Sequence, residues 1–446
     1  MRQPAWGFLF PGMVDILRGA RQRDSKFMAL LVMKFGGTSV ADIERIGNAA
    51  RHIKREVDAG NACAIVVSAM ADETNRLVEL TRKASALHDA REYDAVVSAG
   101  EQVTAGILAI VLQSMSIQAR SWQGWQVPIT TNDAHGAARI KEIATEELKS
   151  RLGRGEVAVV CGFQGLAPDN RITTLGRGGS DTSAVALAAA LGADRCDIYT
   201  DVDGVYTTDP RIVAKARRLE RVSYEEMLEM ASLGAKVLQT RSVELAMVKG
   251  VRLLVRSSFQ APQDCAAMRL DGNDSPGTLV CDEDEIVEQQ VVSGITYARD
   301  EAKVAILNVA DKPGVAAAIF GPLADAGINV DMIVQSVSDD GALTNMTFTV
   351  EATQLDRTLE TLKSSRTEIG YADLHGSSDV VKVSVIGIGM RSHAGVASSM
   401  FRALAEKGIN IQAISTSEIK ISVLIDAAYT ELAVRTLHTL YGLDAA

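Results

Sequence analysis

The stretch Leu30-Leu-Val-Met-Lys-Phe-Gly-Gly-Thr-Ser39 carries the strongest indication of the fold. Its first six residues are apolar except for Lys34, which is typical of a buried parallel strand. The strand runs directly into Gly36-Gly37, where unhindered backbone N–H groups and the Lys34 ammonium can approach a polyphosphate together. The spacing of a P-loop is absent, so we expect a different kind of phosphate-binding loop. A glycine-rich strand exit with a solvated lysine is the alternative interpretation.

Similar apolar runs recur through the first 260 residues and alternate with longer amphipathic stretches. The predicted strands are residues 30–35, 62–68, 157–163 and 197–201. The predicted helices are residues 42–59, 75–90, 93–115, 137–152 and 181–191. This alternation predicts an α/β sandwich with a mostly parallel sheet. A ligand site is then expected outside the carboxyl ends of the strands, where the glycine-rich loops fall.

Two later segments also carry polar groups at the ends of predicted elements. One of them leads into an alanine-rich helix and reads Leu175-Gly-Arg-Gly-Gly-Ser-Asp-Thr182. Its glycines allow the backbone to approach a ligand closely, and the Arg177 guanidinium offers a fork of N–H donors that suits a carboxylate. Tyr199-Thr-Asp-Val-Asp-Gly-Val-Tyr206 is similar to the start of a calcium loop but lacks the later ligands, so calcium is rejected. An ordinary capped helix and ordinary turns are the alternatives.

A change of composition between residues 260 and 300 indicates a domain boundary, because breaker residues and the acidic run 282–285 gather there. Beyond it, residues 311–336 match residues 392–417 at eleven of 26 positions. Each copy reads as a strand, a turn, a helix ended by glycine and a second strand. We therefore expect two βαββ modules of roughly 70 residues, which must pack on each other or on a partner chain to bury a core.

Composition excludes several classes of protein. At 446 residues the chain is long enough for about three domains. Hydrophobic residues make up 47% and charged residues 23%, as in ordinary globular proteins. The formal charge of -10 and the lack of a basic tract argue against a nucleic-acid partner. Apolar runs are far shorter than the ~20 residues that cross a bilayer, so no membrane span is expected.

Cysteine usage and the first residues bear on the compartment. The five cysteines are scattered and form no CxxC pair, which favours reduced thiols and a cytoplasmic location over a disulfide or zinc framework. His135 and His393 show no ligand spacing, and we assign them no chemistry and no metal site. Residues 1–27 lack a period, and Pro11 and Gly12 interrupt the run that a secretory signal would need. We expect a disordered, dispensable extension.

Taken in order, four motifs resemble those of the aspartokinases in the amino acid kinase family: Lys34-Phe-Gly-Gly-Thr-Ser39, Gly162-Phe-Gln-Gly165, Leu175 to Thr182, and Tyr199 to Tyr206 followed by Asp209-Pro-Arg211. The C-terminal modules look like the paired ACT domains of that family. The resemblance runs from about residue 29 to the C-terminus. It implies a three-layer α/β/α amino acid kinase fold followed by two α+β, ferredoxin-like ACT domains. The expected domains are 28–260 for the kinase, 261–300 for a linker that could add to the second ACT domain, 301–375 and 376–446.

The resemblance also implies roles for individual residues. The catalytic set would be Lys34, Asp181 and Lys236. The ATP-binding set would be Lys34, Phe35, Gly36, Gly37, Thr200, Asp201, Tyr206, Arg211, Lys236 and Val237. The substrate set would be Ser68, Thr74, Glu101, Arg177 and Ser180, with Arg177 on the α-carboxylate and Glu101 on the α-ammonium. ATP and Mg²⁺ are the implied cofactors.

The implied activity is ATP-dependent phosphorylation of the side-chain carboxylate of L-aspartate to 4-phospho-L-aspartate, the first step towards lysine, threonine and methionine (the diaminopimelate pathway). The acceptor carboxylate is ionised at neutral pH, so no general base is required. Charge neutralisation on the γ-phosphoryl group is required. The alternatives are a kinase for another acceptor, which would lack the paired modules, and a catalytically dead amino-acid sensor, which intact Lys34, Asp181 and Lys236 oppose.

The repeat implies feedback control by lysine and/or threonine. The residues expected to hold the effector are Asp311, Val315, Asn329, Asp331, Gln335, Asn410, Ile411 and Ser417. The second copy replaces Asp331 by Gln412 and Gln335 by Thr416, so we expect the first copy to bind an amino acid more tightly. In the family such sites form where ACT domains of two chains pair, which implies a homo-oligomer. Modules that only dimerise the enzyme are the alternative.

Overall fold

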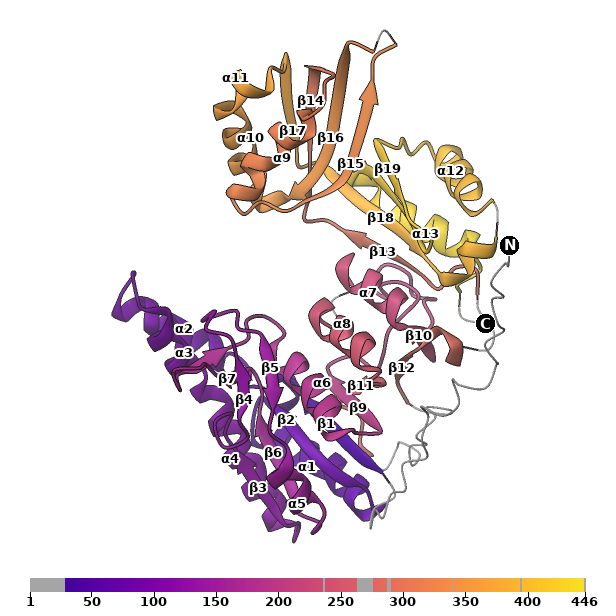
Figure 1. Ribbon diagram of the computed structural model, residues 1–446. Coiled ribbons are helices and arrows are strands. Elements are labelled where there is room, and N and C mark those ends of the chain that lie inside the picture. The colour runs from indigo at the N-terminus through magenta and orange to yellow at the C-terminus, as the bar shows by residue number, and fades with distance from the viewer. Residues whose placement is uncertain are drawn as a thin grey trace, which may run out of the picture.

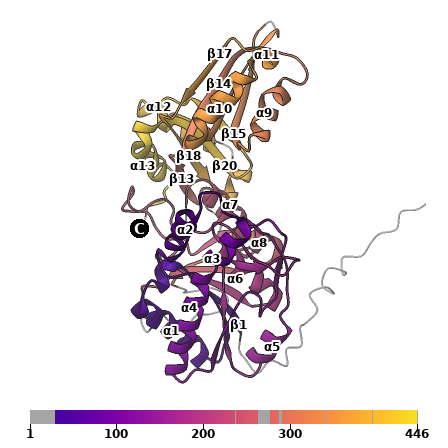
Figure 2. The same cartoon turned by 90° about the vertical axis from the view of Figure 1, so that its left-hand side faces the viewer.

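The structure is a computed structural model that describes residues 29–235, 237–262, 276–286, 290–339, 341–393 and 395–444. The expected extension 1–27, Lys236 and Cys265 lie outside these residues. Figure 1 shows a large α/β domain and two small modules, each with its own sheet. In the views of Figures 1 and 2, the module at the end of the chain lies between the large domain and the other module.

The large domain is built on an eight-stranded sheet in the order β10-β12-β11-β9-β1-β2-β6-β3. Its strands are β1 Leu30–Phe35, β2 Ala62–Val67, β3 Ala119–Trp122, β6 Val157–Cys161, β9 Arg195–Thr200, β10 Arg221–Ser223, β11 Leu253–Ser257 and β12 Thr278–Cys281. Among the described residues every pairing in it is parallel except that of β11 with β12. The sheet confirms the predicted fold class.

Helices cover both faces of this sheet, which is why its strands are apolar throughout. They are α1 Ile43–Asp58, α2 Glu73–Ala84, α3 Ala90–Val97, α4 Ala99–Ser114, α5 Glu146–Leu152, α6 Gly179–Leu191, α7 Tyr224–Ser232 and α8 Thr240–Lys249. In β1, Leu31 and Met33 pack with α1 and α4, whereas Val32 packs with α6 and α8. Because strand side chains alternate, Lys34 shares the α6 face with Val32.

A second, smaller sheet lies in the large domain in the order β5-β4-β7-β8. Its strands are β4 Ile129–Thr131, β5 Ile140–Ile143, β7 Gln164–Leu166 and β8 Ile172–Thr174. The predicted helix 137–152 is therefore wrong, because its first part is β5 and only its second part is α5. The register between β4 and β5 shifts at Lys141, which forms a bulge. The apolar residues Ile140 and Ile143 are therefore spaced by three, which imitates the spacing of apolar residues on one face of a helix.

The predicted helix 93–115 is also two helices, because α3 and α4 meet at Ser98. Residues 90–114 are long and apolar enough to cross a membrane by length and composition alone, and half of their most apolar window is buried. In this fold α4 packs against α1, β3 and β6, with Leu108 and Leu112 fully buried. It is a core helix of the large domain.

The first small module has the order βαββαβ and is continuous in sequence. Its elements are β14 Glu301–Ala310, α9 Val315–Asp325, β15 Val330–Val337, β16 Leu343–Glu351, α10 Leu355–Ser364, α11 Arg366–Ile369 and β17 Asp373–Ser377. The sheet order is β15-β16-β14-β17. Gly327 follows α9 with a φ of 67°, the left-handed conformation that ends helices without a steric cost.

The second small module is discontinuous. Its elements are β13 Gly294–Ala298, β18 Val380–Ile386, α12 Val396–Glu406, β19 Ala413–Thr416, β20 Lys420–Asp426 and α13 Thr430–Leu440, in the sheet order β13-β18-β20-β19. Its edge strand β13 precedes the whole first module in sequence. The predicted linker 261–300 therefore contains two strands: β12 belongs to the large sheet, and β13 belongs to the second module. Each is a short apolar run whose partners lie far along the chain.

Candidate active site

The loops after β1, β2 and β9 meet at the carboxyl edge of the large sheet. Phe35 is paired with Val67 on one side and with Tyr199 on the other. The Gly36 N–H donates to the Tyr199 carbonyl at 3.2 Å, and the Ser68 N–H donates to the Phe35 carbonyl at 3.1 Å. Ser68 and Thr200, far apart in sequence, therefore flank the exit of β1 that carries Gly36 and Gly37.

A buried ion pair lies at this edge. The Lys34 ammonium is 2.6 Å from an Asp181 carboxylate oxygen, and the two side chains are only 10% and 11% exposed. Lys34 points to α6 because of the strand alternation, and Asp181 is in the first turn of α6. A Cβ on Gly36 would lie 3.3 Å from the Lys34 ammonium nitrogen, so glycine leaves the ammonium accessible from the loop. Asp181 therefore holds the Lys34 ammonium in a fixed position beside the glycine loop.

The loop before α6 is held tightly on one side. Gly176 and Gly178 have φ values of 76° and 70°, and a Cβ on Gly178 would collide with Gln239 at 2.2 Å. Arg241 donates to the Leu175 carbonyl at 2.8 Å, which fixes the start of the loop. Arg177 at its tip is exposed, and within the described part of the chain no hydrogen bond or ion pair engages its guanidinium. The structure thus leaves a cationic fork free on a rigid loop.

The start of α4 contributes a buried carboxylate. Glu101 is 3% exposed, and its Oε1 accepts a hydrogen bond from the Ala69 N–H at 3.0 Å. Its other oxygen has no hydrogen-bond partner among the described residues. Burial raises the pKa of Glu101 to about 7. The contact is possible because residue 100 is a glycine, where a Cβ would lie 2.7 Å from the Ala69 Cβ.

Four of the five predicted substrate residues lie in the region of the β2 and β6 exits: Ser68, Thr74, Glu101 and Ser180. Ser68 is next to Ala69 and hence to Glu101, and a Cβ on Gly162 would lie 2.9 Å from Ser180. Thr74 is in the first turn of α2, half-buried, one residue after a Glu73 side chain that approaches Gly100. Arg177 precedes Ser180 on the α6 loop. These positions agree with one site for a small zwitterion.

The predicted nucleotide residues lie on the opposite flank, along the chain after β9. The Thr200 hydroxyl donates to Asp201 at 3.1 Å, and Asp201 is exposed. Tyr206 donates to Asp203 at 3.2 Å. Arg211 is exposed and pairs with Asp209 at 2.8 Å.

Two further predicted nucleotide residues, Lys236 and Val237, lie between α7 and α8 in the sequence. Lys236 is outside the described residues, and its neighbour Val237 is half-buried against the core.

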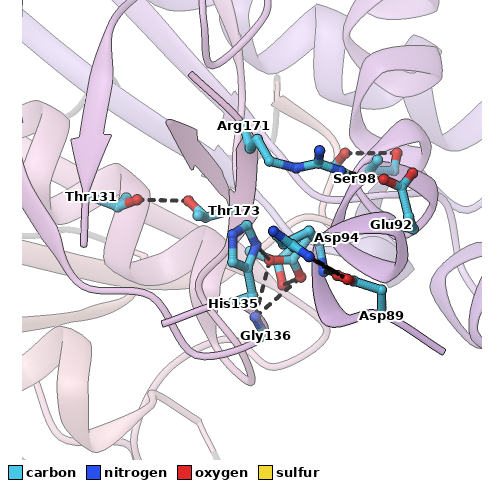
Figure 3. A network of polar contacts seen from close by, with 12 residues as sticks. Asp89, Glu92, Asp94, Ser98, Thr131, His135, Gly136, Arg171 and Thr173 are labelled. Atoms are coloured by element: carbon cyan, nitrogen blue, oxygen red, sulfur yellow. Dashed lines mark hydrogen bonds and ion pairs between the residues drawn. The ribbon is translucent and has the colours of Figure 1, made fainter. Parts of the chain in front are cut away.

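Sequence reasoning missed the polar network around Asp94 (Figure 3). Asp94 is fully buried on α3 and accepts hydrogen bonds from His135 Nδ1 at 2.8 Å, the Gly136 N–H at 3.1 Å and the Thr174 hydroxyl at 2.6 Å. It therefore ties the loop around residue 135 to the end of β8, one residue before Leu175. His135 is a structural hydrogen-bond partner. The sequence feature that could have indicated this network is Asp94 itself, an acidic residue on the apolar face of α3.

The residues predicted to hold an effector lie in the first module and at one edge of the second. Asp311, Asn329, Gln335, Asn410 and Ser417 are exposed, whereas Ile411 is half-buried and Val315 is buried at the start of α9. Asp331 is not free, because Lys382 of the second module donates to it at 2.7 Å. Lys382 also pairs with Glu301. The sequence concealed this contact because Lys382 lies inside the buried strand β18.

Comparison with known proteins agrees with this geometry. The family model of the amino acid kinase family matches residues 29–257, and models of the ACT domain match residues 303–366 and 383–441. An aspartate kinase of Stutzerimonas stutzeri strain A1501 is 52% identical over 419 residues, which cover 94% of this chain and 98% of that relative.

Two solved structures show the same architecture. Aspartokinase III of E. coli in complex with aspartate and ADP, in the R-state, has a TM-score of 0.73 and 28% identity, and covers 92% of this chain and 99% of its own. The same enzyme with lysine and aspartate, in the T-state, has a TM-score of 0.71 at 28% identity over the same shares of both chains. The relatives and the site therefore place this chain among the aspartokinases, kinases of the amino acid kinase family that carry two C-terminal ACT domains.

Proposed function

We propose that this chain transfers the γ-phosphoryl group of ATP to the side-chain carboxylate of L-aspartate and releases ADP and 4-phospho-L-aspartate, the first step towards lysine, threonine and methionine. The observation that carries the proposal is the buried Lys34–Asp181 pair beside Gly36, facing a region that offers both a free Arg177 and a buried Glu101. The E. coli relative crystallised with aspartate and ADP supports the choice of substrates.

The proposed reaction needs little proton transfer. The acceptor carboxylate has a reference pKa of about 3.9, so it is already the nucleophile at neutral pH. A carboxylate oxygen forms the new P–O bond while the bond from the γ-phosphorus to the bridging oxygen breaks, and that electron pair leaves with ADP. Lys34 stabilises negative charge on the phosphoryl oxygens, and Asp181 holds its ammonium in place. Gly36 and Gly37 let the backbone approach the phosphates.

The residues present also fit Mg²⁺. This ion usually binds proteins through one or two carboxylates and otherwise through substrate phosphates. The exposed carboxylate of Asp201, next to the Thr200 hydroxyl at the end of β9, is a donor of that kind. When bound with ATP, the ion would neutralise phosphate charge.

The substrate residues divide the two ends of aspartate between them. Arg177 would clamp the α-carboxylate with its two parallel N–H groups, and the open oxygen of Glu101 would accept the α-ammonium. Ser68, Thr74 and Ser180 would orient the side chain towards the phosphates. A protonated Glu101 cannot make this ion pair. Because the pKa of Glu101 is raised to about 7, aspartate binding should weaken as the pH falls below 7.

The decisive experiment is hydroxylamine trapping of an acyl phosphate with purified protein, ATP and Mg²⁺. Aspartate-dependent hydroxamate is the expected result, and a protein that phosphorylates glutamate or another acceptor in place of aspartate would refute the proposal. Lys34→Ala and Asp181→Ala should lower kcat by about 10²-fold or more. Arg177→Ala should raise the KM for aspartate and leave the KM for ATP unchanged.

Feedback control by lysine and/or threonine at the ACT modules of a homo-oligomer is the second part of the proposal. The E. coli relative crystallised with lysine supports an amino-acid effector. The Lys382 ammonium already pairs with Asp331, which supports the proposal that the Asp331 carboxylate binds an ammonium group. The ammonium of an effector would have to share Asp331 with Lys382 or displace Lys382 from it. Inhibition by lysine, by threonine and by both should be lost or weakened in Asp331→Ala. Undiminished inhibition would place the effector site elsewhere.

A further inference from the structure

The loop of residues 203–219, which follows β9 and carries Tyr206 and Arg211, is built into the core of the second ACT module. Ile212, Val213 and Ala216 belong to the same buried cluster as residues of β18 and α13, such as Val383, Val434 and Leu437. Within the loop itself, the regular structure among the described residues is a single bridge between Tyr206 and Arg218. The shape of this loop therefore depends on the module it packs against.

Thr207 is the buried point at which the loop meets the C-terminal helix. Its side chain is fully buried, and its hydroxyl lies 2.9 Å from His438 Nε2 on α13. The other ring nitrogen of His438, Nδ1, lies 2.9 Å from a carboxylate oxygen of Asp444. The Thr207 oxygen also accepts a hydrogen bond from the Arg217 N–H at 3.2 Å.

The partners fix the protonation of this chain of hydrogen bonds. A carboxylate accepts only, so Nδ1 of His438 carries the hydrogen and donates to Asp444. Burial lowers the pKa of His438, which keeps the ring neutral and leaves Nε2 as an acceptor. Thr207 then donates its hydroxyl hydrogen to Nε2 and accepts from Arg217. The Leu443 carbonyl, 3.5 Å from the Thr207 oxygen, is the more distant acceptor for the same hydrogen. The hydrogen bonds therefore run from the loop to the C-terminal residues.

Further contacts hold the backbone of the same loop at Thr207 and on its C-terminal side. The Ile295 N–H of β13 donates to the Thr207 carbonyl at 2.7 Å. Asp444 forms a β-bridge with Ala216, and Arg435 donates to the Ile212 carbonyl at 3.0 Å. The second module therefore contacts the loop from its first strand and from its last residues.

We propose that Thr207, His438 and Asp444 are positioning residues for the nucleotide, through which the C-terminal end of the second ACT module holds the loop with Tyr206 and Arg211 in its ATP-binding conformation. The inference rests on the nucleotide role of this loop in the proposed function. Thr207 directly follows Tyr206 and is four residues from Arg211. Small displacements of substrate-positioning groups cost large factors in rate, so the anchor of the loop matters for ATP.

The test compares Thr207→Val and His438→Ala with wild type in steady-state kinetics for both substrates. Thr207→Val keeps the shape of the side chain and removes the hydroxyl, which leaves Nε2 without a partner. We expect the KM for ATP to rise roughly tenfold, as for the loss of one buried hydrogen bond, and the KM for aspartate to stay unchanged. Asp444→Asn keeps an acceptor for Nδ1 and should have a smaller effect. His375→Ala, an exposed histidine on β17, is the matched control and should change neither constant.

Two further measurements separate positioning from loss of fold. The melting temperature shows whether each variant is folded. The double variant Thr207→Val/His438→Ala removes both partners, so it should raise the KM for ATP by no more than the worse single variant. An equal rise in both KM values, or a lower melting temperature with an unchanged KM for ATP, overturns the inference. Arg211→Ala separates the two proposals. If it raises the KM for ATP and Thr207→Val does not, only this inference fails, whereas no effect of Arg211→Ala refutes the nucleotide role of the loop as well.

Discussion

The two ACT modules share a sequence repeat but have different relations to the rest of the chain. The buried core of the first module consists of residues between Ala302 and Tyr371, all of them its own. The core of the second module includes Ile212, Val213 and Ala216 from the large domain. The core of the first module therefore contains no residue of the large domain. The core of the second module includes such residues and also shapes the loop assigned to ATP.

This difference matches the distribution of the residues proposed to hold an effector. The first module keeps Asp331 and Gln335, and the second has Gln412 and Thr416 at those positions. The module that kept its carboxylate is the one with no large-domain residue in its core. We infer a division of labour in which the first module senses an amino acid and the second transmits its state to the nucleotide loop. Four experiments, from the largest expected effect to the smallest, can break or sharpen this comparison.

The comparison is tested most strongly by a matched pair of core truncations. Leu362 on α10 and Leu437 on α13 occupy corresponding positions and are both fully buried. Each change to alanine should destabilise its module by about 2–5 kcal/mol. Leu437→Ala should also lower kcat/KM for ATP, whereas Leu362→Ala should keep uninhibited activity and lose its response to the effector. Kinetics with and without lysine and threonine provide the measurement, and equal loss of basal activity in both variants would contradict the division of labour.

The ion pair between the modules should have the next largest effect. Lys382 is 5% exposed and lies between Glu301 and Asp331 of the first module. Lys382→Met leaves the buried Glu301 without a cation, so we expect a loss of about 3 kcal/mol in the free energy of unfolding. Basal activity should persist and inhibition should weaken. Lys303→Met is the control, because Lys303 makes its contact across the modules to the neutral Gln412. Inhibition that is unchanged in Lys382→Met would show that the signal takes another route.

A smaller effect is expected at the contact of α7 with the second module. One oxygen of Glu226 accepts from Ser293 at 2.5 Å and from the Ile388 N–H at 3.0 Å, and the other accepts from Ser223. Glu226→Gln keeps the shape but replaces one acceptor by a donor, which should cost about 1–3 kcal/mol. Denaturant unfolding measures this loss, and Glu220→Gln at an exposed position should leave stability unchanged. Equal stability of Glu226→Gln and wild type would show that this contact does not stabilise the packing of the second module on α7.

The smallest expected effect is the pH dependence of the stability that the Asp331–Lys382 ion pair contributes. Burial of Asp331 opposes its ionisation, but the hydrogen bond and charge of Lys382 outweigh burial and lower the pKa of Asp331. A lowered pKa contributes stability above the unfolded value of about 3.9, and this contribution is lost as the pH falls through the folded value. Asp331 is exposed over part of its surface, so we expect about 1 kcal/mol or less. The difference in melting temperature between wild type and Asp331→Asn should shrink below pH 4, and a constant difference would exclude the ion pair as its cause.

The sequence predicted correctly those helices and strands whose formation depends on residues that are adjacent in the chain. The strand 30–35 agrees with β1 residue for residue, because its apolar run and its glycines are adjacent. The interval 137–152 failed because a bulge in β5 imitates helical spacing. The strands β12 and β13 were missed because their stability comes from partners far along the chain.

The same reasoning applies to the site. Lys34 and Asp181 could be named from their motifs, and the structure pairs them. Asp94, Lys382 and His438 are single polar residues inside apolar elements, and their roles depend on tertiary contacts that no spacing encodes.

The discontinuity of the second module has a consequence for synthesis on the ribosome. Domains fold largely in order of emergence, at about 5–20 residues added per second. The first module is complete once β17 has left the exit tunnel, but β13 must wait for β18, and the nucleotide loop must wait for α13 and Asp444, roughly 200 residues after the loop itself. The loop proposed to bind ATP is thus among the last described parts of the chain to reach its final packing. A nascent chain that has not yet released α13 would contain the Lys34–Asp181 pair and a folded first module, but its loop 203–219 would lack the packing that the second module provides.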